Sequence, residues 1–152
     1  MNYITDYFDE TKMPDEALFQ ELVHFDELNF PYAWTLNSWK DFCRTRKFHL
    51  FLYRQNGQLQ ASALFEEIND GEVGHLHKIA VDQSARKQKI GYNFMMACVR
   101  DLLERGLSGI YLEVATKNEA AIKLYEKCGI EVQRRVKNFY SNGDDAYIMY
   151  NY

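Results

Sequence analysis

The stretch that decides the fold reads Ile79-Ala-Val-Asp-Gln-Ser-Ala-Arg-Lys-Gln-Lys-Ile-Gly-Tyr92. Its apolar opening predicts the end of a strand, its middle predicts a short basic loop, and a helix is predicted from Gly91. The unpaired amides and positive dipole end of a helix N-terminus favour an anion such as a pyrophosphate, and Arg86, Lys87 and Lys89 add positive charge. No P-loop or dinucleotide glycine motif is present. From these residues alone, an anion site and an ordinary basic loop are comparable interpretations.

Upstream of this stretch, the sequence predicts an antiparallel meander of three strands at 48–55, 58–69 and 72–81. Asn56-Gly57 separates the first two strands and predicts a tight hairpin, because both positions tolerate positive φ. Asn69-Asp70-Gly71 predicts the second turn.

The segment before the meander predicts a short strand and two amphipathic helices. The strand is expected at 2–7, and the first helix from about Pro14, which suits a first helical turn. Pro31 is expected to end that unit, and Thr35 to cap the second helix.

Downstream, the hydrophobic period changes from that of strands to that of helices and back again. The predicted elements are a helix from Gly91 to Gly106 with Leu103 in its apolar stripe, a strand through Ile110, Leu112 and Val114, a helix from a Thr116–Glu119 capping box to Lys127, and a hairpin of 130–140 and 146–152. Strand-helix-strand geometry makes the 110–114 strand parallel to the strand that ends at Val81. The predicted fold class is therefore α/β (α+β): a mixed central sheet with antiparallel N-terminal strands, one parallel junction between the strands ending near Val81 and Glu113, and about four flanking helices.

Length and composition indicate one soluble globular domain, residues 1–152, with 47% apolar and 26% charged residues. A net charge of −4 argues against a general nucleic-acid binder. The longest apolar stretch, 94–99, is too short to cross a membrane, and no basic leader precedes an apolar segment, so a cytoplasmic location is expected. The three cysteines are widely spaced and are expected to be buried thiols.

Two histidines raise the question of a metal site. His75 and His77 share one face of a predicted strand, and His-x-His occurs in zinc sites. No third ligand stands at a useful spacing, since His24 and His49 belong to other predicted elements. The sequence therefore predicts no metal.

Two motifs in the C-terminal half resemble those of a known family. Arg86-x-x-Lys89-x-Gly91 resembles the Gln/Arg-x-x-Gly-x-Gly/Ala signature of the GNAT superfamily of acetyl-CoA-dependent N-acetyltransferases, with Lys89 where the family usually has glycine. Residues 112–130 resemble its second signature, and 135–149 resemble the ribosomal-protein-alanine N-acetyltransferase group. Asn29-Phe-Pro-Tyr32 resembles the Phe-Pro element of that group.

The resemblance implies a site for acetyl-CoA and roles for individual residues. Glu113 would be the general base and Tyr125 the general acid of direct transfer to an amine. Phe30, Pro31, Tyr32 and Tyr140 would border the acceptor. The expected cofactor-binding residues are Ile79, Ala80, Val81, Arg86, Lys87, Gln88, Lys89, Ile90, Gly91, Tyr92 and Asn118. The alternative interpretation of Asn118 is a helix cap, a role that is compatible with cofactor contact.

The expected function is acetylation of a protein N-terminal α-amine, with a ribosomal protein as acceptor. The alternatives are a GNAT enzyme acting on a small amine or a lysine side chain, and a non-catalytic acyl-CoA-binding module. The first thirty residues carry eight acidic residues against one basic residue, Lys12. Because Asp26 and Glu27 precede the Phe-Pro element, an acidic rim that attracts a basic acceptor is also expected.

Overall fold

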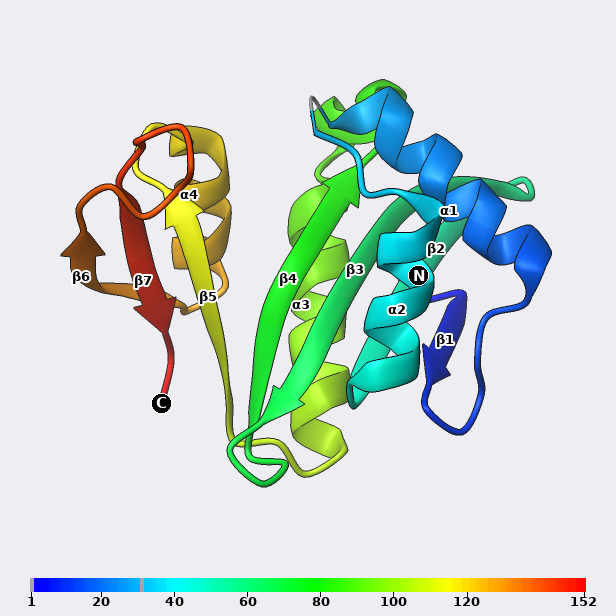
Figure 1. Ribbon diagram of the computed structural model, residues 1–152, viewed down its shortest axis with the longest axis horizontal. Helices are drawn as coiled ribbons and strands as arrows, with labels where there is room; N and C mark the ends of the chain where they lie inside the picture. The colour runs from blue at the N-terminus through cyan, green and yellow to red at the C-terminus, as the bar shows by residue number, and fades with distance from the viewer. Residues whose placement is uncertain (1, 31) are drawn as a thin grey trace.

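One seven-stranded sheet organises the chain, in the order β1-β2-β3-β4-β5-β7-β6 (Figure 1). The structure, a computed structural model, describes residues 2–30 and 32–152, with only the backbone at Lys87 and Gln88. The strands are β1 (Asp6–Asp9), β2 (Phe48–Gln55), β3 (Gln58–Ile68), β4 (Val73–Val81), β5 (Gly109–Ala115), β6 (Glu131–Val136) and β7 (Ala146–Tyr150). The helices are α1 (Glu16–Asn29), α2 (Leu36–Thr45), the short 3₁₀ helix η1 (Gln83–Gln88), α3 (Ile90–Glu104) and α4 (Glu119–Lys127).

Helices cover the two faces of the sheet unequally. In Figure 1, α1 and α2 lie in front of β2 to β4, α3 lies behind them, and α4 lies behind β5 and β7. Two cores result, because successive side chains of a strand point to opposite faces. One core joins α3 and α4 to residues such as Phe51 and Phe65, and the other joins α1 and α2 to residues such as Leu50 and Leu64. The predicted mixed sheet, with antiparallel N-terminal strands and four α-helices, is confirmed.

The parallel junction between β4 and β5 is short. The paired residues are Val73 with Gly109, Gly74 with Ile110, and His75 with Tyr111. Beyond these pairs the two strands diverge, and Figure 1 shows them widest apart at the ends that reach Val81 and Ala115. The split in the sheet exposes the backbone at the end of β4.

A bulge in β4 changes which face its residues occupy. The register between β3 and β4 shifts at Leu64/Phe65, so that Phe65 pairs with Leu76 and Leu64 pairs with Lys78. Leu76 therefore packs in the core under α3, whereas Lys78, two residues later, reaches Asp26 of α1. A bulge inserts one residue and so reverses the alternation.

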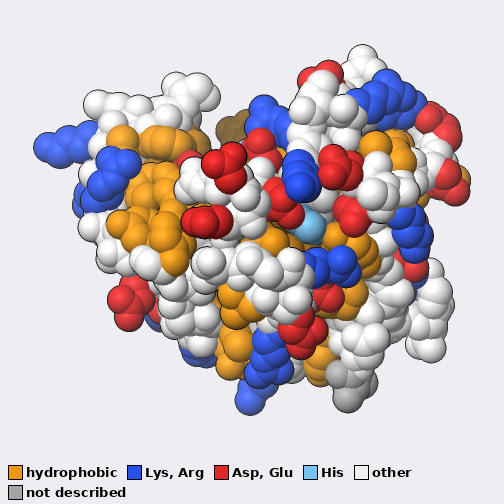
Figure 2. All heavy atoms as spheres, turned by 90° about the horizontal axis from the view of Figure 1, so that it is seen from below, with side chains coloured by type: hydrophobic (Ala, Val, Ile, Leu, Met, Phe, Trp, Pro, Cys, Tyr) orange, Lys and Arg blue, Asp and Glu red, His pale blue; other side chains and the backbone are white. Residues whose placement is uncertain are grey.

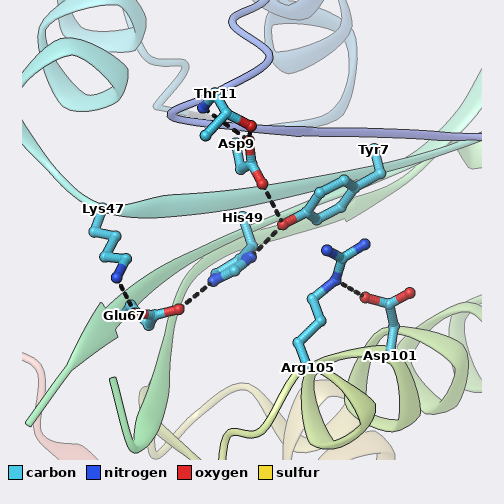
Figure 3. Close-up of polar contacts among 8 residues, drawn as sticks. All are labelled: Tyr7, Asp9, Thr11, Lys47, His49, Glu67, Asp101 and Arg105. Atoms are coloured by element: carbon cyan, nitrogen blue, oxygen red, sulfur yellow. Dashed lines mark hydrogen bonds and ion pairs between the residues drawn. The ribbon is translucent and has the colours of Figure 1, made fainter. Parts of the chain in front are cut away.

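At the opposite edge of the sheet, β1 is held by a polar network (Figure 3). The Tyr7 hydroxyl lies 2.6 Å from Nδ1 of His49, whose Nε2 lies 2.8 Å from Oε1 of Glu67. Lys47 Nζ is 3.1 Å from the other oxygen of Glu67, and the guanidinium of Arg105, the residue that follows α3, lies over the Tyr7 ring. This network ties β1 to β2, β3 and α3.

The predicted hairpin at Asn56-Gly57 is confirmed, with φ values of 52° and 78°. The first strand lies at Asp6–Asp9 instead of 2–7, because Tyr3 and Ile4 pack against the core under α3. The expected first-turn position of Pro14 is also wrong, because the Asp15 side chain accepts from the Leu18 amide and caps α1.

Three C-terminal predictions are wrong in detail. The capping box at Thr116 is wrong, since the Thr116 amide bonds to the Asp145 carbonyl, and the alternative is confirmed: Asn118 caps α4, because its side chain accepts from the Ala121 amide. The strand expected at 130–140 ends at Val136, since the Asp145 carboxylate accepts the Asn138 amide and closes a turn. Leu103 is 44% exposed, although its spacing places it in the apolar stripe of α3.

No helix in the described part of the chain is long and apolar enough to span a membrane. The three cysteines, Cys43, Cys98 and Cys128, are free and buried, as predicted.

Candidate active site

A cavity of about 390 Å³ lies where the split sheet meets the helix N-termini. It is lined by residues from four parts of the chain: Asn29 and Phe30 after α1; Ile79, Ala80 and Val81 of β4; Arg86, Lys89, Gly91 and Tyr92 around the start of α3; and Asn118, Ala120, Ala121, Leu124 and Tyr125 of α4. The structure thus brings together most of the residues predicted to hold the cofactor. Ile90 is buried in the core under α3 and is not among the residues that line the cavity. The side chains of Lys87 and Gln88, and all of Pro31, lie outside the described residues.

The start of α3 is a candidate anion site. Lys89 adopts a left-handed conformation, with φ of 59° and ψ of 17°, between η1 and α3. No side chain in the described chain caps α3, so its first amides keep their donor capacity and its positive dipole end faces the cavity. The left-handed backbone conformation is energetically unfavourable for any residue that has a Cβ. This is a physical reason why the family resemblance has glycine at this position.

Arg86 fixes the loop in addition to supplying charge. Its Nε donates to the Val81 carbonyl at 3.1 Å, and a terminal nitrogen donates to the Asn29 carbonyl at 3.4 Å. The loop is thereby tied both to the end of β4 and to the end of α1. Lys89 is exposed at the rim of the same cavity.

Glu113 lies on the sheet face opposite Leu112 and Val114, outside the residues that line the cavity. Its Oε1 lies 2.7 Å from Nε2 of His75. Burial raises the pKa of the Glu113 carboxyl, but the hydrogen bond and charge of His75 and the charge of His77 lower it more, so its pKa is below the ordinary value. At neutral pH it is a carboxylate, with His75 as a partner that the sequence analysis had not assigned.

Tyr125 is buried in the wall of the cavity. Burial, then the charges of Tyr140 and Cys128, raise the pKa of its hydroxyl well above the ordinary value. The hydroxyl therefore keeps its proton at neutral pH and is able to donate it. Burial and the Glu113 charge also raise the pKa of Tyr140.

The residues predicted to border the acceptor are only partly together. Phe30 lines the cavity, and Tyr32 is 84% exposed. The Phe30 ring also lies 4.4 Å from Lys78 Nζ, and Trp34 lies 4.6 Å from the same atom.

The expected acidic rim is wrong in the case of Asp26. This carboxylate is fully buried, 3.0 Å from Lys78 Nζ and 2.9 Å from the Trp39 indole nitrogen. Burial raises the pKa of Asp26 despite the charge of Lys78. Because Asp26 is buried and paired with Lys78, its carboxylate does not add to an acidic surface that would attract a basic acceptor. Figure 2 shows acidic and basic side chains interspersed on the face that it presents.

Beyond Glu113, the open face of the sheet continues into stacked aromatic rings. The Tyr111 and Tyr150 ring centroids are 6.3 Å apart, and those of Tyr150 and Tyr152 are 4.7 Å apart. Figure 2 shows apolar side chains gathered at this end of the molecule. The His75 ring lies edge-on to Tyr111 at 5.1 Å and joins the aromatic rings to the polar groups around Glu113.

Comparison with known proteins agrees with this geometry. N-alpha-acetyltransferase 30 of Dictyostelium discoideum is 31% identical over 140 residues, which cover 86% of this chain and 72% of that protein. The [ribosomal protein bS18]-alanine N-acetyltransferase of Escherichia coli K12 is 34% identical over 102 residues, covering 65% and 68%. A crystal structure of the ribosomal-protein-S18-alanine N-acetyltransferase from Escherichia coli superposes with a TM-score of 0.80 at 26% identity, covering 95% of this chain and 91% of that one.

The split sheet, the uncapped helix and the family resemblance define the class of the protein as an N-acetyltransferase. The chain belongs to the acetyltransferase (GNAT) family, whose model matches residues 15–130.

Proposed function

We propose that this enzyme transfers an acetyl group from acetyl-CoA to the N-terminal α-amine of a protein, with a ribosomal protein as the acceptor. The observation that carries the proposal is the cavity between the end of β4, the uncapped start of α3 and the wall of α4. Of the two relatives described above, one is named an N-alpha-acetyltransferase and the other a ribosomal-protein-alanine N-acetyltransferase, which supports this acceptor. The family and a cavity with one cationic end together support acetyl-CoA as the donor.

The residues present fit acetyl-CoA at both ends of the cavity. The amides at the start of α3, with Lys89 and Arg86 beside them, suit the pyrophosphate. The apolar wall of α4, with Ala121 and Leu124, suits the pantetheine arm. Bound acetyl-CoA supplies an activated thioester, and the exposed backbone of β4 near Ile79 offers an amide to its carbonyl oxygen.

Glu113 and Tyr125 then have complementary protonation states. The Glu113 carboxylate accepts the proton that the amine loses as its nitrogen bonds to the acetyl carbon. The Tyr125 hydroxyl donates its proton to the sulfur as the carbon–sulfur bond breaks. An α-amine has a reference pKa near 8, against about 10.4 for lysine, so a carboxylate is an adequate base for an N-terminus.

Mass spectrometry of a matched peptide panel tests the acceptor. We expect acetylation of a ribosomal-protein N-terminal peptide, and the same acetylation when every lysine is replaced by arginine. The matched control carries a blocked N-terminus with its lysines intact, and it should stay unmodified. Activity on the blocked peptide alone would indicate a lysine acetyltransferase, and activity on polyamines alone would indicate a small-amine enzyme. Binding of acetyl-CoA without any transfer would indicate a non-catalytic module.

A further inference from the structure

A cluster of side chains with metal-ligand chemistry lies on the face of the sheet that α2 partly covers. It consists of Glu66 of β3 and of His75 and His77 of β4, and the donor atoms of these three side chains all lie within 4.8 Å of one another. His77 Nε2 lies 3.0 Å from Glu66 Oε1, and the two imidazole centroids are 4.2 Å apart. Glu113 adjoins the cluster through its 2.7 Å contact with His75.

The sheet register explains why the sequence did not reveal the third donor. Glu66 pairs directly with His75 across the β3–β4 ladder, and paired residues share a face. The bulge at Leu64/Phe65 leaves His77 on the same face as His75. The absence of a third ligand, on which the prediction of no metal depended, is therefore corrected by tertiary structure.

The chemistry of these donors matches a transition metal. Zinc is commonly bound by histidine nitrogens together with carboxylate oxygens. The carboxylates of Glu66 and Glu113 add negative charge beside the two histidines, and Arg46 lies 2.9 Å from Glu66.

The cluster is both accessible and held in place. The side chains of His75 and Glu113 are 19% and 22% exposed, and those of His77 and Glu66 are 21% and 20% exposed. A surface cavity that includes Asp41 and Arg46 opens beside His77, which gives an ion a path from solvent. The Phe42 ring packs edge-on against the His77 ring at 4.8 Å and restricts its rotation.

We propose that Glu66, His75 and His77 bind one divalent transition-metal ion of the zinc type, with Glu113 in reach as a fourth ligand. A tetrahedral ion about 2.1 Å from each donor atom holds the donor atoms about 3.4 Å apart. Side-chain rotations that move the donor atoms by roughly an ångström therefore complete the site. The site is separate from the acetyl-CoA cavity, since none of its three residues lines that cavity.

One consequence rests on the proposed function. A metal at His75 removes the hydrogen bond that Glu113 receives, or takes Glu113 as a ligand, and either change withdraws the proposed base. Zinc should therefore inhibit acetyl transfer. Failure of this consequence alone would count against the role of Glu113, whereas direct binding measurements test the metal site without any acetyl transfer.

Calorimetric titration of the chelator-treated protein with Zn²⁺ tests the site. We expect one ion per chain, and a loss of affinity of about tenfold or more in H77N and in E66Q. H24N is the matched control, because the same substitution in α1 leaves the cluster intact and should leave the affinity unchanged. Thermal melting of each variant without metal checks that it is folded.

A second measurement needs no variant. Cobalt(II) should give the imidazole NMR signals of His75 and His77 the large contact shifts of metal ligands, which the His24 signal should lack. The proposal is overturned if zinc gives no binding heat, if H77N binds it as tightly as the unmodified protein, or if the cobalt spectrum shows the strong sulfur charge-transfer band of a cysteine ligand.

Discussion

Replacement of Lys89 separates two properties of one residue, its backbone strain and its charge. The left-handed conformation, with φ of 59°, costs a residue with a Cβ roughly 1–2 kcal/mol. Glycine avoids that cost, but it also has greater conformational freedom in the unfolded chain. That freedom lowers the gain in stability by roughly 0.4–1 kcal/mol. The net expectation for K89G is a gain of about 0.5–1 kcal/mol, or roughly 1–4 °C in Tm for a chain of this size.

Alanine and arginine at the same position are the matched controls. K89A keeps the strain and loses the charge, so its Tm should stay close to that of the unmodified protein. K89R keeps both properties and should change neither measurement. Because the lysine is exposed, its attraction to a phosphate is worth about 0.5–1 kcal/mol, and K89A and K89G should both bind CoA roughly two- to fivefold more weakly.

Differential scanning calorimetry and CoA titration calorimetry at low salt measure the two effects. The strain argument is refuted if K89G is no more stable than K89A. The placement of the pyrophosphate at the start of α3 is refuted if both variants bind CoA as tightly as the unmodified protein.

Further predictions concern catalysis, the buried ion pair and the acid limb of stability. E113Q and Y125F should each lower kcat about 10²-fold in steady-state assays with little change in acetyl-CoA affinity, and unchanged rates in both would remove their catalytic roles. K78M should lower the free energy of unfolding by about 3–5 kcal/mol in urea titrations, because it leaves the buried Asp26 carboxyl without its cationic partner, and adding D26N should recover part of that loss. Burial raises the pKa of Glu67, but the hydrogen bonds from His49 and Lys47 lower it by more than burial raises it. The pKa of Glu67 is therefore below the ordinary value. Its ionised form therefore contributes stability that is present above the unfolded pKa and is lost as pH falls through the folded pKa, so E67Q should cost about 1 kcal/mol at pH 7 and progressively less in acid. An equal cost at all pH values would contradict this assignment.

Local chemistry was sufficient for much of the fold. Asn56-Gly57 predicted a hairpin because two adjacent residues that tolerate positive φ are needed there, and the structure has that turn. The alternation of Ile110, Leu112 and Val114 predicted a strand with Glu113 on the opposite face. Each signal depends on residues a few positions apart, which the sequence displays directly.

Element ends were predicted less well because distant partners decide them. The strand expected at 2–7 begins later, since Tyr3 packs beneath α3 and pairing with β2 is regular only from Asp6. The capping box was predicted to begin at Thr116, but Asn118 caps α4, because the Thr116 amide has a partner in the turn before β7. The motif around Arg86 and Gly91 nevertheless located the cavity, because that strand, loop and helix are contiguous in sequence.

The sequence by itself determined the order of strands and helices along the chain, the strand, loop and helix that border the cavity at the start of α3, and the family resemblance, since these follow from residues near one another in the chain. Only the tertiary structure decided that Asp26 is buried against Lys78, that His75 contacts Glu113, and that Glu66 joins the histidine pair. These contacts join residues 9 to 52 positions apart, and they depend on sheet register, the β4 bulge and helix packing. A one-residue shift of a strand reverses the face of every side chain, so such contacts are fixed only when the whole sheet is assembled.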